Sequence, residues 1–395
     1  MTDSLISPVP ELAPPRKAPQ AVTDLVENIE RTWQFARPYR EEVEQEFYRL
    51  LFHLSPSARE FFPVSMQAEN GRVVRALIRV LRLVHRPDDL VPVLRQLGRD
   101  HRKFELHPSH YEAVGTALLG SLKHCLGAVW TPEVERAWAE AYTLVARAMQ
   151  DAAADAEADG VEPPYWTGTV SEHHRLSWDL ALVRVELDQA MPYRAGQYVT
   201  VEVPQRPRLW RCLSPANAPR TDGSLEFHVR AVDGGWVSRA IVGHTQPGDV
   251  WKFGAPMGCL QVDRESRRPV LMIAGGTGIA PIQAIIDDLG RWVDNPETTL
   301  LYGARHWDDL YALDRLYSFS TSNPWLTVWP VVEDTSSTPD AEQATTAEAV
   351  TRWGPWTEHD ILVSGPAAMI EATVTELLRV GVHPSQIRYD PFLTA

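Results

Sequence analysis

The clearest candidate for a metal ligand in this chain is His101. Leu90, Leu94 and Leu97 recur at helical spacing, and four further residues lead to His101. This spacing predicts that the imidazole lies on the apolar face of a helix, near its C-terminal end. A neutral imidazole there can ligate haem iron, and a buried histidine bonded to a carbonyl is the alternative. We expect charge to cover the outer face of this helix end through Arg99, Asp100, Arg102 and Lys103.

A glycine-rich turn supplies the second chemical pattern. An apolar run over 269–274 precedes the turn, and an apolar helix beginning at Ile282 follows it. Strand, glycine turn and helix in this order are the context of a dinucleotide-binding loop, because glycines let the backbone approach a pyrophosphate. The N-terminus of the helix also favours negative charge. The residues of this predicted loop are Gly275, Gly276, Thr277, Gly278 and Pro281.

A basic residue stands where such folds distinguish between nucleotides. The next apolar run, 298–302, is followed by Gly303, Ala304 and Arg305. An acidic residue near the end of this strand favours NADH, whereas an arginine can pair with the 2'-phosphate of NADPH. Arg305 therefore favours NADPH, and an arginine that is merely exposed on the surface is the alternative.

Two further segments have residue types that bind diphosphates. Arg211 and Ser214 lie three residues apart near the end of a predicted strand, and the guanidinium fork can grip a pyrophosphate through two hydrogen bonds. Downstream, Gly234 and Gly235 precede a short predicted helix over 239–242, and glycines before a helix N-terminus form an anion cradle. Taken singly, the first segment is better explained as a surface strand and the second as a hairpin turn.

The elements that must position these residues change type along the chain. From about 23 to 158 the periodic segments have helical spacing, and proline or glycine separates most of them. Helices alone over this length predict an all-α domain with obliquely packed helices. Besides the stripe that leads to His101, the apolar stripes are Val43-Phe47-Leu50-Leu51-Leu54, Val73-Leu77-Val80-Val84, Tyr111-Val114-Leu118-Leu122 and Val134-Trp138-Ala141-Val145-Ala148.

The apolar period changes to two after an Ala-rich acidic stretch over 151–164, which we interpret as a helix that frays into a linker. Alternating runs at 181–187, 199–203 and 225–229 predict short strands with turns between them, which is typical of an antiparallel barrel. The glycine turn and its flanking apolar runs then predict an α/β block with a parallel sheet.

Composition narrows the classes of protein that remain. A net charge of −14 argues against binding to nucleic acid or to an anionic membrane. Cys125, Cys212 and Cys259 lie far apart, which argues against a zinc ribbon or a disulfide framework and suggests a reducing compartment. No apolar run approaches the roughly 18 residues of a membrane span, and the first residues do not resemble a secretion signal. We therefore expect a cytoplasmic protein.

Several segments of the first half resemble the globin domain of flavohaemoglobins. The segment 97–111 is similar to the proximal segment of that domain, and 47–48 with 61–63 is similar to its distal side. The run 135–142 resembles its last helix. The resemblance implies an axial haem ligand, a distal hydroxyl, a phenylalanine packed on the haem, an apolar distal lid and a donor near the axial histidine. These are, in order, His101, Tyr48, Phe62, Leu77 and Tyr111.

Two positions depart from the pattern of that globin domain. Val73 falls where the family has a distal glutamine, and a valine cannot hydrogen-bond a ligand. Ala153 falls where the family has a glutamate that makes the axial histidine more basic. Either Asp151 or Asp155 could replace this glutamate, or the proximal side is less electron-rich than in the family.

The second half resembles the ferredoxin-reductase-like family. Arg211 and Ser214 match the two ends of its flavin motif, and the resemblance implies that the serine hydroxyl reaches the N5 edge of FAD. Leu213 replaces an aromatic residue that lies along the flavin, and Ser364 replaces a cysteine beside the nicotinamide. The remaining cofactor contacts that the resemblance implies are Gln197, Tyr198, Gly235, Val237, Ser238, Gly365, Pro366, Asp390 and Phe392.

The order of these segments is that of a flavohaemoglobin, so we expect a multidomain chain. Its parts are an all-α globin domain, an antiparallel β-barrel FAD domain and an α/β parallel-sheet NAD(P) domain. The cofactors implied are haem b, FAD and either NADPH or NADH. The predicted divisions are a disordered tail at 1–22, the globin domain at 23–158, a linker at 159–164, the FAD barrel at 165–265 and the NAD(P) domain at 266–395.

The resemblance implies an NAD(P)H-dependent nitric oxide dioxygenase that converts nitric oxide and dioxygen to nitrate. Electrons would pass from NAD(P)H to FAD and then to haem. Two other functions stay open: a haem-based sensor or ligand-binding protein with a self-reducing module, and an NAD(P)H flavin reductase of an oxygenase system. We expect small molecules as partners, no nucleic acid, no membrane, and a monomer or weak dimer.

Overall fold

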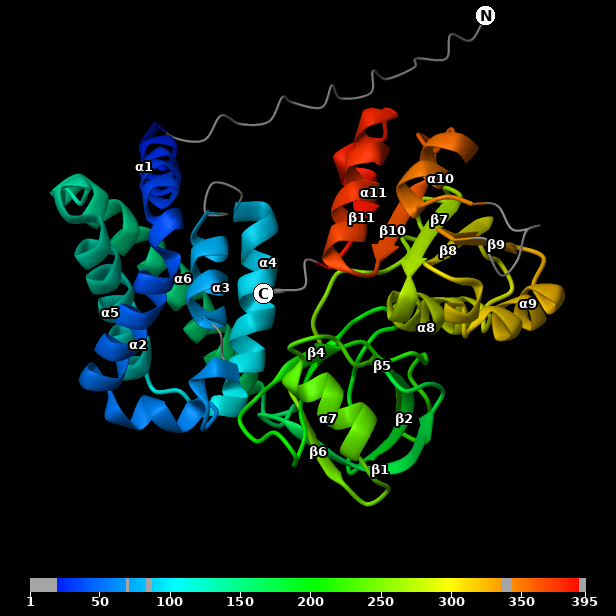
Figure 1. Ribbon diagram of the computed structural model, residues 1–395, viewed down its shortest axis with the longest axis horizontal. Helices are drawn as coiled ribbons and strands as arrows, with labels where there is room; N and C mark the ends of the chain where they lie inside the picture. The colour runs from blue at the N-terminus through cyan, green and yellow to red at the C-terminus, as the bar shows by residue number, and fades with distance from the viewer. Residues whose placement is uncertain (1–19, 69–70, 83–86, 335–342, 391–395) are drawn as a thin grey trace, which may run out of the picture.

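The computed structural model describes residues 20–68, 71–82, 87–334 and 343–390 of the chain. These residues form a helical domain, a β-barrel and a parallel sheet covered by helices (Figure 1). The predicted fold class is therefore confirmed. Val84 and Phe392, which the sequence singled out, lie outside the described residues, as does the predicted tail up to residue 19. Residues 20–22, which the prediction assigned to that tail, are helical.

The helical domain forms a layered bundle. Its last helix begins at a proline after Thr131, whose side chain caps the helix by accepting a hydrogen bond from the Val134 amide. It ends at Gly160, which adopts a left-handed φ of 62°. The helices are α1 (Gln20–Ala36), α2 (Arg40–Leu54), α3 (Arg72–Arg82), α4 (Pro87–His101), α5 (Pro108–Leu126) and α6 (Pro132–Asp159).

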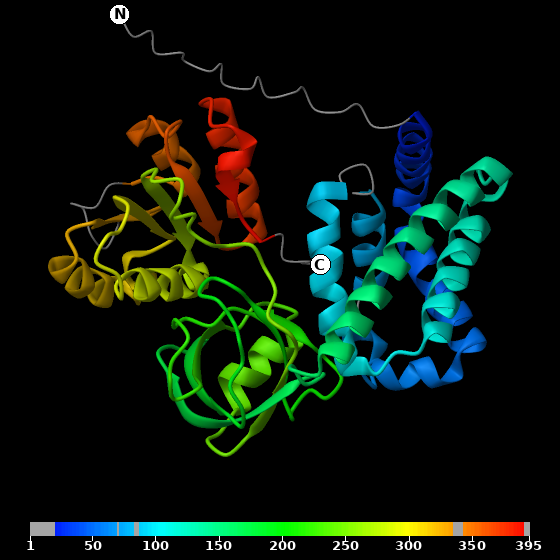
Figure 2. The ribbon, with the colours of Figure 1, turned by 180° about the vertical axis from the view of Figure 1, so that it is seen from behind.

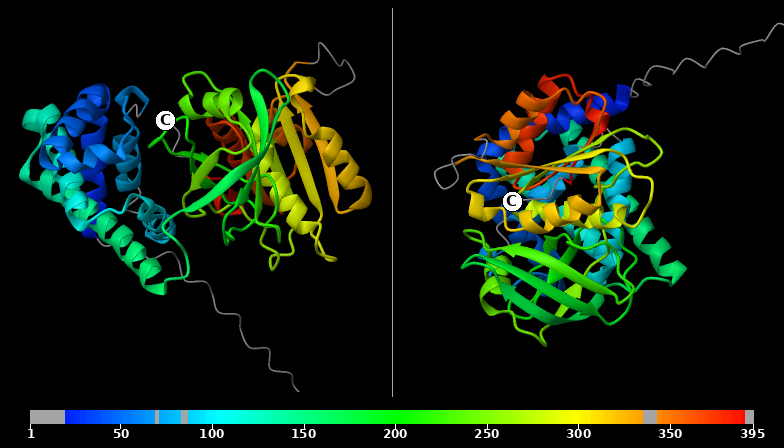
Figure 3. Two further views of the ribbon diagram at one scale, coloured as in Figure 1. Left: turned by 90° about the horizontal axis from the view of Figure 1, so that it is seen from below. Right: turned by 90° about the vertical axis from the view of Figure 1, so that its right-hand side faces the viewer.

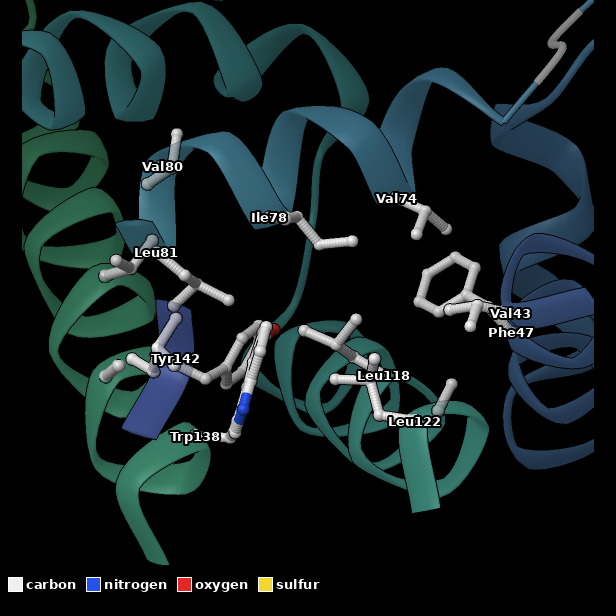
Figure 4. Packing of buried hydrophobic residues seen from close by; sticks show 14 of the residues in the cluster. Val43, Phe47, Val74, Ile78, Val80, Leu81, Leu118, Leu122, Trp138 and Tyr142 are labelled. Atoms are coloured by element: carbon white, nitrogen blue, oxygen red, sulfur yellow. The ribbon is translucent and has the colours of Figure 1, made fainter. Parts of the chain in front are cut away.

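The core of this domain lies between α2, α3, α5 and α6, and the side chains of Phe47, Ile78, Leu118 and Trp138 converge in it (Figure 4). On α3 the most deeply buried residues are Val74, Ile78 and Leu81. This face is centred one residue further along the helix than the predicted stripe through Val73 and Leu77. Those two side chains are half-buried at its edge. The helix has two neighbouring rows of apolar residues, about 100° apart around its axis, and this explains the difference.

The barrel follows a short connection after α6. Its six strands pair antiparallel in the order β4-β3-β6-β1-β2-β5 within the described residues. Trp166, Phe227, Trp251 and Phe253 fill its interior. The strands are β1 (Trp166–Arg175), β2 (Leu180–Leu187), β3 (Val199–Glu202), β4 (Arg211–Leu213), β5 (Ser224–Arg230) and β6 (Val250–Phe253), and the helix α7 (Trp236–His244) lies between β5 and β6 in sequence. This helix begins three residues before the predicted start at 239.

The nucleotide domain has a parallel sheet in the order β11-β10-β7-β8-β9. The side chains of β7 alternate: Met272 packs on the α8 and α9 side, and Ile273 packs on the α10 and α11 side. Helices on both faces explain why this strand is apolar throughout. The strands are β7 (Val270–Gly275), β8 (Thr298–Ala304), β9 (Leu326–Val332), β10 (Asp360–Ser364) and β11 (Ile387–Arg388), and the helices are α8 (Ile279–Leu289), α9 (Leu313–Ser322), α10 (Thr346–Trp353) and α11 (Ala367–Arg379).

The three parts meet around the barrel. Seen from behind, the C-terminal end of α4 and the barrel lie side by side, and the nucleotide domain lies above the barrel (Figure 2). Seen from below, the helical domain and the nucleotide domain lie at opposite ends of the molecule (Figure 3, left). In the described part of the chain no helix has both the length and the apolar character needed to span a membrane.

Candidate functional site

The His101 ring is held by the helix that carries it. Its Nδ1 lies 2.7 Å from the backbone carbonyl oxygen of Leu97, one turn earlier on α4. Nδ1 therefore donates its proton to that carbonyl, which leaves the lone pair on Nε2. Burial lowers the pKa of His101, and the neighbouring Asp100 carboxylate opposes this effect. A neutral imidazole with an available Nε2 is the form that ligates haem iron.

An apolar face next to the core of the helical domain suits a flat apolar group. Tyr48, Phe62, Val73, Leu77 and Leu97 all pack against that core, yet each is only half-buried. The Tyr48 and Phe62 rings meet edge to face with centroids 5.5 Å apart. A haem site requires half-buried apolar walls at the edge of a closed core. The His101 Nε2 atom and this apolar wall therefore both fit haem.

Phe62 is positioned by the turn before it. Pro56–Phe61 form a short 3-10 helix, and the Arg59 guanidinium then bonds the carbonyls of the following residues. Its Nη1 donates to the Phe62 and Pro63 oxygens at 3.2 and 2.8 Å. Its Nη2 donates to the Val64 oxygen at 2.8 Å. Arg59 thus fixes the backbone that aims Phe62 at Tyr48.

The structure shows the surroundings of the residues that were predicted near the proximal side of His101. The Tyr111 backbone carbonyl accepts a hydrogen bond of 2.6 Å from the Tyr142 hydroxyl, and burial raises the pKa of Tyr111. Asp151 and Asp155 are exposed, and they line a groove of about 770 Å³ between α4 and α6 together with Arg95. The acceptor that orients His101 is therefore the neutral Leu97 carbonyl, which donates less electron density to the ring than a carboxylate would.

The predicted flavin cradle lies on β4 beside β3. Arg211 pairs with Val201 and Leu213 with Val199, so the two β4 side chains point to the same side of the sheet. Arg211 also donates from Nη1 to the Trp210 carbonyl at 2.7 Å. Ser214 follows the strand directly, half-buried.

The residues on either side of this strand form tight turns. Gln197 accepts a hydrogen bond from the Arg194 amide at 2.8 Å, and the backbone of Tyr198 pairs with Met257. At the start of α7, a Cβ at Gly235 would collide with Ser238, while Val237 is buried. The Arg206 guanidinium lies 5.8 Å from the centre of the Trp236 ring, so the loop before β4 touches the start of this helix. This contact joins the loop before β4 to α7 through residues outside the predicted diphosphate clamp.

The nicotinamide loops pack on one another. A Cβ at Gly278 would lie 2.5 Å from the Ser364 carbonyl oxygen and 2.6 Å from the Gly365 Cα. Pro366 follows at the N-terminus of α11, and Pro281 lies buried in the first turn of α8. The loop 275–278, which includes Gly275, Gly276 and Thr277, therefore meets the loop after β10 as a single surface. The prediction started α8 at Ile282, but the helix begins at Ile279.

Two contacts connect this nicotinamide surface with its neighbours. Gln283 on α8 donates to the Ala216 carbonyl at 3.1 Å, two residues after Ser214. Asp390 accepts a hydrogen bond from the Cys259 amide at 2.7 Å, and burial raises the pKa of Asp390 to about 6. The segment after the flavin strand thus contacts α8, and Asp390 contacts the segment that follows the barrel.

Arg305 does not belong to these loops. It is exposed at the end of β8, and its backbone carbonyl accepts from the Asp334 amide at 2.9 Å. It lines a cavity of about 550 Å³ together with Trp178 and Arg239. The predicted ribose contact is therefore accessible to a ligand, with a second guanidinium and an indole ring beside it.

One sequence expectation about the outer face of α4 was wrong. Asp100 is only 3% exposed and the Lys103 side chain only 2%, because the barrel covers them. Thr200 on β3 bonds both side chains. Opposite charges three residues apart are a visible signal in the sequence. The same spacing is also typical of an exposed ion pair on a helix surface, so it could not identify this interface.

Comparisons with known proteins cover all three parts. The globin family model matches residues 45–149, the oxidoreductase FAD-binding domain model matches 167–262, and the oxidoreductase NAD-binding domain model matches 272–375. The reductase component of the naphthalene 1,2-dioxygenase system of Pseudomonas putida is 31% identical over 234 residues, which are 57% of this chain and 68% of that protein. The chain spans about two thirds of the length of the first reductase relatives that it matches.

Relatives that carry all three parts match almost end to end. A flavohemoprotein of Xylella fastidiosa is 23% identical over 366 residues, covering 88% of this chain and 91% of that protein. The crystal structure of a Malassezia yamatoensis flavohemoglobin with bound FAD and haem has the same fold. Its TM-score is 0.74 at 18% identity, over 94% of this chain and 99% of that one. With a globin domain joined to the FAD- and NAD-binding domains of an oxidoreductase, the chain belongs to the flavohaemoglobin family.

Proposed function

We propose that this oxidoreductase is an NAD(P)H-dependent nitric oxide dioxygenase. The observation that carries the proposal is the His101 ring, whose Nδ1 bonds Leu97 and leaves Nε2 for a metal. This ring lies in the same chain as a flavin cradle and nicotinamide loops that pack together. The likeness to a flavohemoprotein over most of both chains supports this assignment.

Each group of residues has a defined task in this proposal. The loop 275–278 binds the dinucleotide, and Arg211 with the N-terminus of α7 binds the FAD diphosphate. His101 would ligate the haem iron, and Tyr48 would offer a hydroxyl to a diatomic ligand. When bound, FAD takes up a hydride and releases its electrons singly, and haem supplies one-electron chemistry at its iron.

The apolar residues around Tyr48 exclude water from the haem site. Phe62 and Leu77 offer no hydrogen bond, and Val73 replaces a possible amide donor. Tyr48 is therefore the distal donor of this site. The overall reaction balances when two nitric oxide and two dioxygen molecules, with one NAD(P)H, give two nitrate ions, one NAD(P)⁺ and one proton.

Nitrate formation tests the proposal directly. The oxy form of the purified protein, prepared with NADPH and air, is mixed with nitric oxide in a stopped-flow instrument, and nitrate is then measured. We expect rapid loss of the oxy spectrum with nitrate as the product. Slow or absent nitrate formation would contradict dioxygenase activity and favour the haem-based sensor.

A second candidate function has an observation of its own. The FAD and NAD half is 31% identical to the reductase component of a dioxygenase system, which supports a flavin reductase whose helical domain only docks an oxygenase. The Soret band of the purified protein separates the two candidates. A band that vanishes in His101→Ala supports the haem enzyme, and a protein without any Soret band after haem supplementation supports the flavin reductase.

We further infer a preference for NADPH and a cytoplasmic location. The exposed Arg305, with Arg239 beside it in the same cavity, supports pairing with a 2'-phosphate. The three cysteines of the chain are free, which suits a reducing compartment.

A further inference from the structure

A buried ion pair lies at the boundary between the helical domain and the barrel. The Lys103 ammonium is 2.5 Å from the Asp100 Oδ2 atom and 2.5 Å from the Thr200 hydroxyl oxygen. That hydroxyl donates in turn to the other oxygen of Asp100 at 2.8 Å. The three side chains therefore form a closed triangle of hydrogen bonds, which we name the Asp100–Lys103–Thr200 lock.

The lock is complete only when the two domains touch. Asp100 and Lys103 belong to the end of α4 and the turn after it, whereas Thr200 lies on β3. The barrel also has Gly254 at the contact, where a Cβ would collide with Asp100 and Thr200. Separation of the domains would expose the ion pair to water. The Thr200 hydroxyl would then lose its hydrogen bonds to Asp100 and Lys103. Since a buried pair is stable only with complete hydrogen bonding, this contact selects one docked position.

The docked position brings aromatic rings between His101 and the flavin strand. The Phe104 ring lies 5.7 Å from the His101 ring and 6.1 Å from the Trp210 ring, measured between centroids. Trp210 directly precedes Arg211 on β4. The Lys103 ammonium lies 4.4 Å from the centre of the Trp210 ring and 5.0 Å from that of Phe104. The lock and the rings are thus one packed unit.

Two further contacts lie near this boundary, and neither is a buried ion pair. Gln96 accepts a hydrogen bond from the Gly258 amide at 2.9 Å, and Arg99 pairs with Glu162 at 2.7 Å. The Arg99 side chain is more than a third exposed, so solvent screens its pair. The buried lock is therefore the specific contact of this boundary.

We propose that the Asp100–Lys103–Thr200 lock holds the helical domain in the position that permits electron transfer from FAD to haem. Lys103 is a positioning residue in this proposal, because it acts through the placement of His101 relative to β4. Each transfer moves one electron, two transfers consume the hydride electrons of one NAD(P)H, and no atom is exchanged at the lock. The inference rests on the proposed electron path and adds the device that sets its geometry.

Lys103→Met in the full-length protein with haem and FAD bound is the first test. Anaerobic mixing with NADPH reports FAD bleaching and haem reduction at separate wavelengths. We expect FAD bleaching as in the unsubstituted protein. Haem reduction should be slower by about tenfold or more, because an unpaired buried Asp100 disfavours the docked position. Small-angle scattering of the same sample should show a larger radius of gyration, a readout that does not depend on activity.

Three further variants make the test specific. Lys123→Met removes a lysine from an exposed pair with Glu135, where the Lys123 side chain is 61% exposed, and should change neither haem reduction nor scattering. Thr200→Val keeps the side-chain shape but removes the hydroxyl, and should slow haem reduction in the same direction by a smaller factor. The double variant Asp100→Asn with Lys103→Met should recover part of the loss, because no charge remains buried alone.

The outcomes separate the lock from the proposed function. Unchanged haem reduction and unchanged scattering in Lys103→Met would overturn the lock. If Lys103→Met does not fold, Thr200→Val decides, and normal haem reduction in that variant overturns the lock. If NADPH bleaches FAD in the unsubstituted protein but leaves haem oxidised, the proposed electron path is wrong. The scattering comparison then shows by itself whether the lock holds the two domains together.

Discussion

Asp390 is a carboxyl group whose ionisation opposes folding. It is 6% exposed, and burial raises its pKa from 3.8 to about 6, although the Cys259 amide bonds its carboxylate. Between about pH 4 and pH 6 the folded protein therefore binds a proton that the unfolded chain has already lost. The stability contribution of the protonated group is fully present below the unfolded pKa and is lost as the pH rises through the folded pKa.

Asp390→Asn removes this pH dependence. We expect the variant to become more stable than the unsubstituted protein as the pH rises from 4 to 7, by up to about 3 kcal/mol, which is the energy of a two-unit pKa shift. Denaturant unfolding of the nucleotide domain at several pH values measures the difference. Parallel curves for both proteins across this range would show that Asp390 titrates normally.

Arg305 is a second residue with a testable charge. Arg305→Asp should raise the KM for NADPH by about tenfold or more, since hydrogen bonds to charged groups contribute about 1.5–3 kcal/mol. The KM for NADH should change little, and Arg305→Lys should fall between the two for NADPH. Steady-state kinetics with each nucleotide measure the effect. Equal KM changes for NADPH and NADH would rule out a contact with the 2'-phosphate.

At the scale of elements, the crossing of α4 and α6 positions His101. Gly98 lies next to Leu97, and a Cβ there would collide with the backbone carbonyl of Met149 on α6. A backbone group cannot rotate away as a side chain can, so the helices must move apart when Gly98 is replaced. Since Leu97 orients the His101 ring, a shift of α4 changes the ligand geometry.

Gly98→Ala should therefore destabilise the helical domain by about 1–3 kcal/mol, a typical cost of overpacking. It should also lower haem retention, measured as the ratio of Soret to protein absorbance. Gly120→Ala is the matched control, because the nearest atom to its Cβ would be the flexible methyl end of Leu50. Alanine also favours a helix over glycine by about 1 kcal/mol, so we expect the control to retain haem. Full haem retention in Gly98→Ala would contradict the close approach.

At the scale of the whole molecule, each cofactor should stabilise a different part. The half-buried wall of Tyr48, Phe62 and Leu77 belongs to the helical domain, whereas the flavin cradle belongs to the barrel. A ligand stabilises the unit that binds it by mass action, by about 4 kcal/mol at 1,000 times its Kd.

Haem added to haem-free protein should raise the melting temperature of the helical transition. FAD added alone should raise that of the barrel instead. Differential scanning calorimetry of the full-length chain resolves the two transitions, with His101→Ala as the variant in which the effect of haem is reduced. A haem effect of the same size in His101→Ala would show that another site binds it.

The parts whose chemistry depends on neighbouring residues in the chain could be predicted from local patterns. The loop 275–278 follows an apolar strand and opens a helix, and only glycine at Gly278 permits the approach of the Ser364 backbone. His101 was predicted to face inward because the helical period is fixed, so a residue four positions after Leu97 shares its face. The fold class follows from the same periods, 3.6 in the first part and two in the next.

Which charged residues are buried could not be read from local sequence patterns. Asp100 and Lys103 have the spacing of an exposed helical pair, and their burial depends on Thr200, about a hundred residues later in the chain. The sequence left open whether Asp151 or Asp155 serves as the partner of His101. In the structure both aspartates are exposed in a surface groove, and the Leu97 carbonyl accepts from the His101 ring. Periodicity reports the face of a helix that its own domain covers. The apolar periodicity of a helix does not show where a second domain packs on the opposite face, because those contacts come from strands that are distant in sequence.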